Sequence, residues 1–308
     1  MAFATGYSIP QSDPPRSPRE TLPTMYDLPS EFPEEPGLPD EYHDLQPQLL
    51  SRTLTLANYR REDWFAASDL NVYYDVQHPL WHKRPDWFLA VGVPRLYGGE
   101  ELRRSYVVWQ EGRSPEVVVE FLSPGTEAGD LGRFLAGDDS PATPANFPAA
   151  SEVTGGEQAE LPPEKFTVYE RYLRVPYYVV YNRYSGALRF FQLVGDSYQE
   201  QPILREGNLK IWLPGLGVGL GLWQGEFEGI TQPWLRWCDQ EGQWLLLDTE
   251  RERIAKEQAQ LAKEQSQAQV LQAAQRLLAT GMALDEIVTL LGLTDEQLQQ
   301  VMEQLDLP

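Results

Sequence analysis

Residues 116–132, EVVVEFLSPGTEAGDLG, decide the fold because they place a charged residue inside an apolar run. Side chains at every second position of a strand face the same side, so Val118, Glu120 and Leu122 share one face. The other face carries Val117, Val119 and Phe121. Both faces are apolar apart from the glutamate, which predicts a strand buried on both sides. A carboxylate there is costly unless a cation, a proton or donor groups compensate, so Glu120 is a candidate functional residue.

A second acid stands in the same relation to another apolar run. Asp86 follows Pro85 directly and begins DWFLAVGV. Oxygen ligands from neighbouring strands, with water in the remaining positions, suit Mg²⁺, which orients water for phosphodiester hydrolysis and neutralises phosphate charge. A lysine can assist, and Lys165 opens the segment EKFTVYERYLR. Spacing alone leaves plainer roles open, since Asp86 can cap a strand and Glu120 can pair with an arginine.

The remaining pattern predicts an α/β (α+β) fold with a mixed central sheet flanked by helices. Leucines 45, 49, 50 and 54 share one face of a helix that starts at Asp40. Aromatic and β-branched runs predict strands in 70–76 and 86–93, a hairpin from 105–110 and 116–122, and two strands in 176–183 and 188–194. A helix is expected over 164–174, and short strands in 196–250 are expected to complete the sheet.

The composition of the chain divides it into four parts. Residues 1–37 hold many prolines and are expected to form a disordered arm. Residues 38–249 form the predicted domain, in which 133–163 is a flexible insertion. Residues 250–276 predict a Gln/Glu-rich helix, and 277–308 a small helix-turn-helix-like tail. Association with another chain is the plainer role for this tail, and it provides a route to a homodimer.

Charge and residue counts exclude several classes of protein. The net charge of −21 argues against a protein that coats nucleic acid through a generally positive surface. The single cysteine, Cys238, rules out an intrachain disulfide and a cysteine-based zinc site, and three histidines are too few for a His-rich metal cage. No apolar run is long enough for a membrane helix, and no leader pattern is present, so a cytoplasmic location is expected.

The succession of RPDWFLAVGVP, RRSYVVWQEGRSPEVVVEFLSPGTEAGDLG and KFTVYERYLRVPYYVVYNR resembles the Uma2 family of endonucleases, also called DUF820. This family is a branch of the PD-(D/E)xK restriction-endonuclease-like superfamily, and the resemblance covers about residues 38–245. It implies a Mg²⁺-dependent nuclease, with Mn²⁺ able to substitute, that acts on nucleic acid, with DNA as the expected substrate.

The resemblance also assigns site residues. Asp86 is similar to the acid of the PD motif, and Glu120 to the acid of the second motif, before the Ser123-Pro124 signature. Lys165 is similar to the family's lysine, which in relatives follows closely after the DLG that matches residues 130–132; here an insertion intervenes. Glu41 resembles an additional acid that supports the metal in some members of the superfamily.

Three neighbouring residues have weaker assignments. Ser123 is expected in a turn or cap, because no histidine is plausibly paired with it and no nucleophile elbow surrounds it. Tyr169 can line the site or belong to the core. Asp130 can cap a helix or lie near the site, and the sequence does not decide between these roles.

A rival hypothesis is a catalytically weak or inactive nuclease fold that acts as a binding or scaffold module. The net charge of −21 favours it, because a phosphate backbone meets a repulsive long-range field. A basic concavity around Asp86 and Glu120 favours the nuclease instead. The arginines expected to form such a concavity are Arg84, Arg103, Arg104, Arg133 and Arg171.

Overall fold

The computed structural model describes residues 40–123, 125–135, 161–203 and 210–294, together with residues 297 and 299. The chain divides into two compact units, Met1–Leu245 and Leu246–Pro308. The predicted arm at 1–37, most of the predicted insertion and the last residues of the tail lie outside the described residues.

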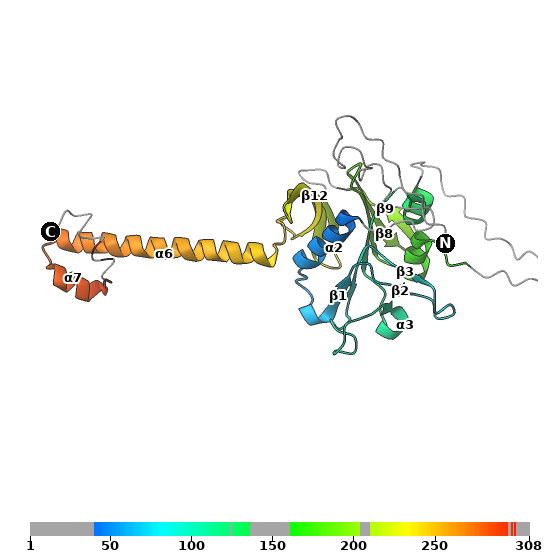
Figure 1. The fold of residues 1–308 in the computed structure, drawn as a ribbon, viewed down its shortest axis with the longest axis horizontal. Helices are drawn as coiled ribbons and strands as arrows, with labels where there is room; N and C mark the ends of the chain where they lie inside the picture. Colours follow the sequence, from blue (N-terminus) through cyan, green and yellow to red (C-terminus); the bar gives the residue numbers. More distant parts are fainter. Residues whose placement is uncertain are drawn as a thin grey trace, which may run out of the picture. The chain divides into compact units, whose positions relative to one another are not determined.

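The first unit is built on a six-stranded mixed sheet (Figure 1). Its strand order is β1-β4-β6-β7-β8-β9, and β6 and β7 are its parallel pair, with Glu120 opposite Val180. The mixed sheet with its helices confirms the predicted α/β (α+β) class. The strands are β1 (Trp64–Ala67), β4 (Trp87–Val91), β6 (Val117–Phe121), β7 (Tyr177–Asn182), β8 (Ala187–Val194) and β9 (Ser197–Glu200).

One face of this sheet is covered by helix α2 (Glu41–Thr53) and a second sheet, β10-β11-β12. The side-chain amide of Gln46 on α2 forms two hydrogen bonds with the backbone of β12. It donates to Leu235 O and accepts from Leu235 N, both at 2.8 Å. The indole of Trp237 donates to Leu50 O at 2.9 Å. These bonds fix α2 against β12. The second sheet consists of β10 (Lys210–Leu213), β11 (Val218–Phe227) and β12 (Ile230–Cys238).

The opposite face holds the larger core cluster, where Val118, Phe88 and Tyr178 are fully buried. It packs under short helical segments, which are α4 (Glu127–Leu131), the 3₁₀ turn η2 (Gly132–Phe134), α5 (Lys165–Thr167) and the π-helical turn η3 (Val168–Tyr172). A third sheet adjoins this core and consists of β2 (Val72–Tyr73), β3 (His82–Lys83) and β5 (Tyr106–Val107). A further 3₁₀ turn, η1 (Arg61–Asp63), precedes β1.

Two expectations about strand pairing are wrong. The predicted hairpin of 105–110 and 116–122 does not form, because β5 pairs in parallel with β2 and is followed by helix α3 (Val108–Glu111). Gly112 ends this helix in the left-handed conformation, so the chain leaves the sheet instead of reversing within it. The strands of 196–250 do not complete one sheet either: β9 extends the main sheet, but β10 to β12 form their own.

The second unit contains α6 (Asp248–Ala279) and α7 (Leu284–Leu291). Most described residues of α6 are exposed, and its apolar contacts gather at its end, where Ala274, Ile287 and Leu293 form a small cluster. Gly281, with φ of +86°, makes the turn between the helices. Self-association through these helices stays a prediction. Within the described residues, no helix combines the length and apolarity that crossing a bilayer requires.

Candidate active site

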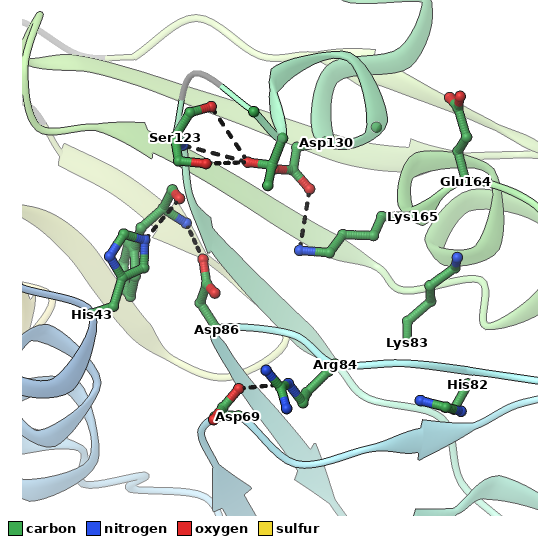
Figure 2. A pocket seen from close by; sticks show the side chains of 14 residues that line it. His43, Asp69, His82, Lys83, Arg84, Asp86, Ser123, Asp130, Glu164 and Lys165 are labelled. Carbon is green, nitrogen blue, oxygen red and sulfur yellow. Dashed lines mark hydrogen bonds and ion pairs between the residues drawn. The ribbon is translucent and has the colours of Figure 1, made fainter. Parts of the chain in front are cut away.

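A cavity of about 400 Å³ opens where six segments of the first unit meet (Figure 2). It lies at the start of β4 and the end of β6, with α4, α5, β3 and the first turn of α2 around it. Its charged and histidine lining residues are His43, Asp69, His82, Lys83, Arg84, Asp86, Asp130, Glu164 and Lys165.

Glu120 lies beneath this cavity and is fully buried. Its Oε2 accepts a hydrogen bond from Lys165 Nζ at 2.9 Å, and its Oε1 accepts one from the Tyr169 hydroxyl at 2.6 Å. Burial raises the pKa of Glu120 to about 7, in part offset by the charge of Lys165 and reinforced by the charge of Asp86. The residue is therefore a compensated buried carboxylate, as the alternation of strand β6 predicts.

Asp86 reaches the same place from the neighbouring strand. Strands β4 and β6 pair with Trp87 opposite Val119, which sets Asp86 beside the end of β6. Its Oδ2 accepts the backbone N–H of Phe121 at 2.6 Å, and the side chain lines the cavity. Burial raises the pKa of Asp86, although the charge of Lys165 and the Phe121 N–H oppose the rise.

Asp130 is a third carboxylate of this group. It lies on α4, is 1% exposed, and lines the cavity. Neither of its oxygens has a hydrogen-bond partner within the part of the chain that the structure describes, while Lys165 Nζ lies at ion-pair distance, 3.4 Å from Oδ1. Burial raises the pKa of Asp130 to about 6, against the charge of Lys165. The sequence left this residue between a cap and the site, and the structure places it in the site.

Lys165 stands between the carboxylates. Burial alone would lower its pKa, but the charges of Glu120 and Asp130 outweigh burial, so the pKa is raised and the ammonium stays charged. The lysine is four residues before Tyr169: Lys165 lies on α5 and Tyr169 on the π-helical turn that follows it, and both side chains bond to Glu120. The structure thus brings Lys165 into contact with Glu120 and places Asp86 at the same cavity on the neighbouring strand, while the catalytic roles of the three residues stay a prediction.

Gly132 holds this arrangement together. Its φ is +50°, and a Cβ built on it would lie 2.8 Å from Cγ of Phe166, the residue after Lys165. Only glycine adopts this conformation at no steric cost and lets the two segments approach so closely. The glycine therefore sets the distance between Asp130 and Lys165.

The donor set fits a hard divalent cation. Glu120 and Asp130 contact the one ammonium and Asp86 lies beside Glu120, so the acids outnumber the cation. Within the described chain, the buried oxygens of Asp130 have no hydrogen-bond partner. Among the described residues, however, no group of three or more acidic, histidine or cysteine side chains lies close enough together to hold a metal ion as the side chains stand. Lys165 lies where the oxygens of Glu120 and Asp130 approach, and it balances part of their charge.

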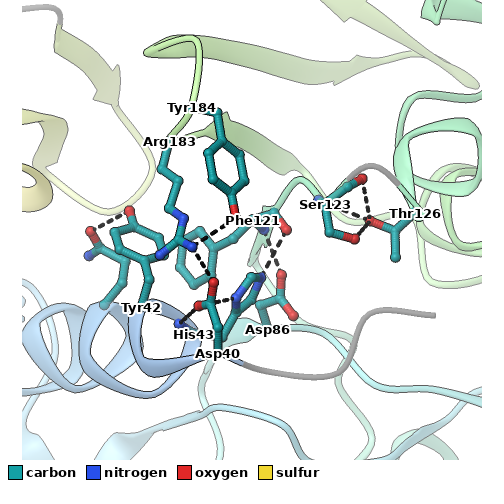
Figure 3. A network of polar contacts seen from close by, with 10 residues as sticks. Asp40, Tyr42, His43, Asp86, Phe121, Ser123, Thr126, Arg183 and Tyr184 are labelled. Atoms are coloured by element: carbon teal, nitrogen blue, oxygen red, sulfur yellow. Dashed lines mark hydrogen bonds and ion pairs between the residues drawn. The ribbon is translucent and has the colours of Figure 1, made fainter. Parts of the chain in front are cut away.

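His43 on α2 is a lining residue that sequence reasoning missed (Figure 3). Its Nδ1 lies 2.9 Å from Asp40 Oδ1, and its Nε2 lies 3.2 Å from Phe121 O. Burial would lower its pKa, but the hydrogen bond to Asp40 and the charge of Asp86 outweigh burial and raise it. Both partners are acceptors, so a protonated ring can donate to each. The Asp-x-x-His spacing at a helix start was the available signal.

Arg183 secures the outer side of this pair. Its guanidinium forms an ion pair with Asp40 and donates to the Tyr184 hydroxyl at 2.8 Å. It also lies over the ring of Tyr42, 5.1 Å from the centroid. The start of α2 is thereby tied to the end of β7.

Glu41 is not brought to the cavity. It is exposed on α2 and is absent from the cavity lining, whereas His43, two residues later in the same turn, lines the cavity. The expected basic concavity is also largely wrong, because Arg84 is the one of its five arginines that lines the cavity. The buried guanidinium of Arg103 is held by both carboxylate oxygens of Glu111. The guanidinium of exposed Arg133 is held by both oxygens of buried Glu170. Arg104 lines a separate pocket, and Arg171 lies beside Glu170.

Ser123 and Tyr169 both lie near the cavity, in different roles. Ser123 is part of a turn, as predicted: its hydroxyl lies 3.2 Å from that of Thr126, whose N–H donates to Ser123 O at 3.1 Å. Tyr169 is fully buried in the core and also binds Glu120 through its hydroxyl. Of the two roles considered for it, the core role is the one the structure shows, since Tyr169 does not line the cavity and reaches the site only through its bond to Glu120.

Comparison with known families identifies the family of the chain. The family model Uma2, described as "Putative restriction endonuclease", matches residues 20–223, a span that includes Asp86, Glu120, Asp130 and Lys165. The match ends within β11. No curated protein and no solved structure matches the chain. Since the family model covers about two thirds of the sequence, the chain belongs to the Uma2 family.

Proposed function

We propose that this protein is a Mg²⁺-dependent endonuclease that hydrolyses phosphodiester bonds of nucleic acid, with DNA as its substrate. The observation that carries the proposal is that Lys165 contacts both Glu120 and Asp130, while Asp86 lines the same cavity from the neighbouring strand. Family membership supports the same reaction class.

The three acids would hold the ion, and Mn²⁺ can take its place. A divalent ion at such a site neutralises phosphate charge and acidifies water. The acids come from three elements, β4, β6 and α4, so the fold and not a local motif sets their positions. Each acid has a raised pKa because it is buried, and a bound cation favours the ionised form of all three.

Lys165 supplies the positive charge of the protein itself. Its ammonium contacts Glu120 and Asp130, and it lines the cavity where a phosphate would enter. A cation held in a partly desolvated site stabilises charge that develops on phosphate during hydrolysis. Tyr169 orients Glu120 from the core side and keeps one of its oxygens engaged.

The proposal is tested by a cleavage assay with Mg²⁺ and Mn²⁺ on supercoiled, linear and single-stranded DNA and on RNA. The parent protein is expected to cut DNA, and Asp86→Asn and Glu120→Gln are expected to be inactive. Glu41→Gln is the matched control, because it removes an exposed carboxylate outside the cavity. A parent that cuts none of these substrates, or acid variants that cut as well as the parent, would refute the proposal.

The alternative is a nuclease fold that binds or scaffolds without cutting. The net charge of −21 and the acids Asp69 and Glu164 in the cavity lining favour it, because they repel phosphate. The scaffold hypothesis predicts that the parent neither cuts nucleic acid nor releases or absorbs heat when titrated with Mn²⁺. The nuclease hypothesis predicts cleavage and a heat of Mn²⁺ binding.

A further inference from the structure

Lys83 is a cation of the cavity that the catalytic group leaves unused. It lies on β3, three residues before Asp86, and lines the cavity with a half-buried side chain. Figure 2 shows it on the opposite side of Lys165 from Asp86. No hydrogen bond or ion pair joins its ammonium to any residue that the structure describes.

The other full cations of the cavity are already engaged. Lys165 contacts Glu120 and Asp130 at 2.9 and 3.4 Å, and Arg84 Nε contacts Asp69 Oδ1 at 2.7 Å. A phosphate that binds to either must compete with a carboxylate already in place. Lys83 can donate three hydrogen bonds without breaking any within the described chain.

The charges around Lys83 also favour an anion. Burial lowers the pKa of Lys83, and the nearby charge of Lys165 lowers it further, against a smaller opposing effect of Glu164. Two ammonium groups that repel each other in a partly desolvated cavity are both stabilised when a negative group lies between them. A backbone phosphate is such a group, and the acids on the other side of Lys165 would repel it from there.

We infer that Lys83 is a phosphate-binding residue, which holds a non-bridging oxygen of the nucleic-acid backbone at the edge of the cavity and so positions the strand against Asp86 and Lys165. The inference rests on the proposed function, since it names how the same cavity holds its substrate. Lys83 is a positioning residue in this account. It contributes one phosphate contact and no proton transfer.

Binding of a fluorescein-labelled DNA oligonucleotide, followed by anisotropy with Ca²⁺ in place of Mg²⁺ over a range of salt concentrations, tests the inference. Lys83→Gln and Lys83→Met are expected to raise Kd about tenfold, because each removes one hydrogen bond from a charged donor to phosphate. The slope of log K against log salt is expected to fall by roughly 0.9, the value for one lost phosphate contact on duplex DNA. Lys83→Arg is expected to restore both.

Lys256→Gln is the matched control, since it removes the same charge from an exposed position on α6. It is expected to leave Kd and the salt slope near those of the parent. If the parent binds DNA and Lys83→Gln has the same Kd and slope, the inference is wrong and the proposed function stands. If the parent binds no DNA, the proposed function and the inference are both overturned.

Discussion

Lys165 Nζ contacts Glu120 Oε2 at 2.9 Å, although the two residues are 45 positions apart in the chain. The lysine comes from a short helix and the glutamate from a fully buried strand, and Asp130 approaches the same ammonium from a third element. This contact makes the acids and the lysine one electrostatic unit. Changes to one member should therefore alter the ionisation of the others.

Lys165→Gln tests this coupling. The substitution removes the charge that lowers the pKa of Glu120 and Asp130, so both acids should titrate at higher pH. At pH 8.5 we expect cleavage to be lost while Mn²⁺ binding is kept, because the carboxylates remain. Calorimetric titration beside the cleavage assay measures the two effects. Loss of Mn²⁺ binding together with cleavage would show that the lysine is needed to build the metal site.

The hydroxyl of Tyr169 offers a matched pair of substitutions. Tyr169→Phe leaves Glu120 Oε1 buried without its donor and should cost about 1–3 kcal/mol of unfolding free energy. Tyr74→Phe removes a buried hydroxyl that has no hydrogen-bond partner, and it should be neutral or slightly stabilising. Urea unfolding of both variants measures the difference. Equal losses would mean that the bond to Glu120 contributes no stability.

Gly132 and Gly129 form a second matched pair. Gly132→Ala introduces a Cβ at positive φ that meets the Phe166 ring, and we expect a loss of about 2 kcal/mol or more, with reduced Mn²⁺ affinity. Gly129→Ala meets nothing within 4 Å on helix α4 and should stabilise by about 0.5–1 kcal/mol. Thermal unfolding distinguishes them, and similar melting temperatures would contradict the close approach of α4 and α5.

Metal binding should release protons in a definite pH window. Burial raises the pKa values of Glu120 to about 7 and of Asp130 to about 6, so both acids are partly protonated at pH 6 and mostly ionised at pH 8. A divalent cation binds the ionised form, so its affinity should fall as pH falls through this window. Calorimetry in two buffers of different ionisation enthalpy should show proton release at pH 6 and little at pH 8. Equal release at both values would place the bound ion elsewhere.

Much of the fold can be predicted from the sequence because the order of apolar and polar residues indicates which strands are buried. The alternation around Glu120 predicted a strand buried on both faces, and strand β6 is buried at every position. The pairing of β5 was not predictable in the same way. A short helix after β5 takes the chain away from the hairpin, and its partner β2 lies more than thirty residues earlier.

The residues of the site likewise fall into those that the sequence identifies and those that it does not. Asp86, Glu120 and Lys165 were identified through family motifs, and the structure brings them together. The place of Asp130 and His43 in the site depends on tertiary contacts, which the sequence pattern does not show. Asp130 pairs with Lys165, and His43 lies against Phe121 O, both far away along the chain. Glu41 was expected from its resemblance to an additional acid of the superfamily, but it lies two residues from His43, about half a helical turn, so the two side chains point to different sides of α2.

The most direct test of the account is a calorimetric Mn²⁺ titration of the parent, Glu120→Gln, Asp130→Asn and Glu41→Gln at pH 8. The account predicts that the parent and Glu41→Gln bind the ion with similar affinity. The Glu120 variant should lose binding, and the Asp130 variant should bind at least tenfold more weakly, as is typical when a ligand or its support is removed. A parent that binds no Mn²⁺, or Glu120 and Asp130 variants that bind it as tightly as the parent, would contradict the central claim.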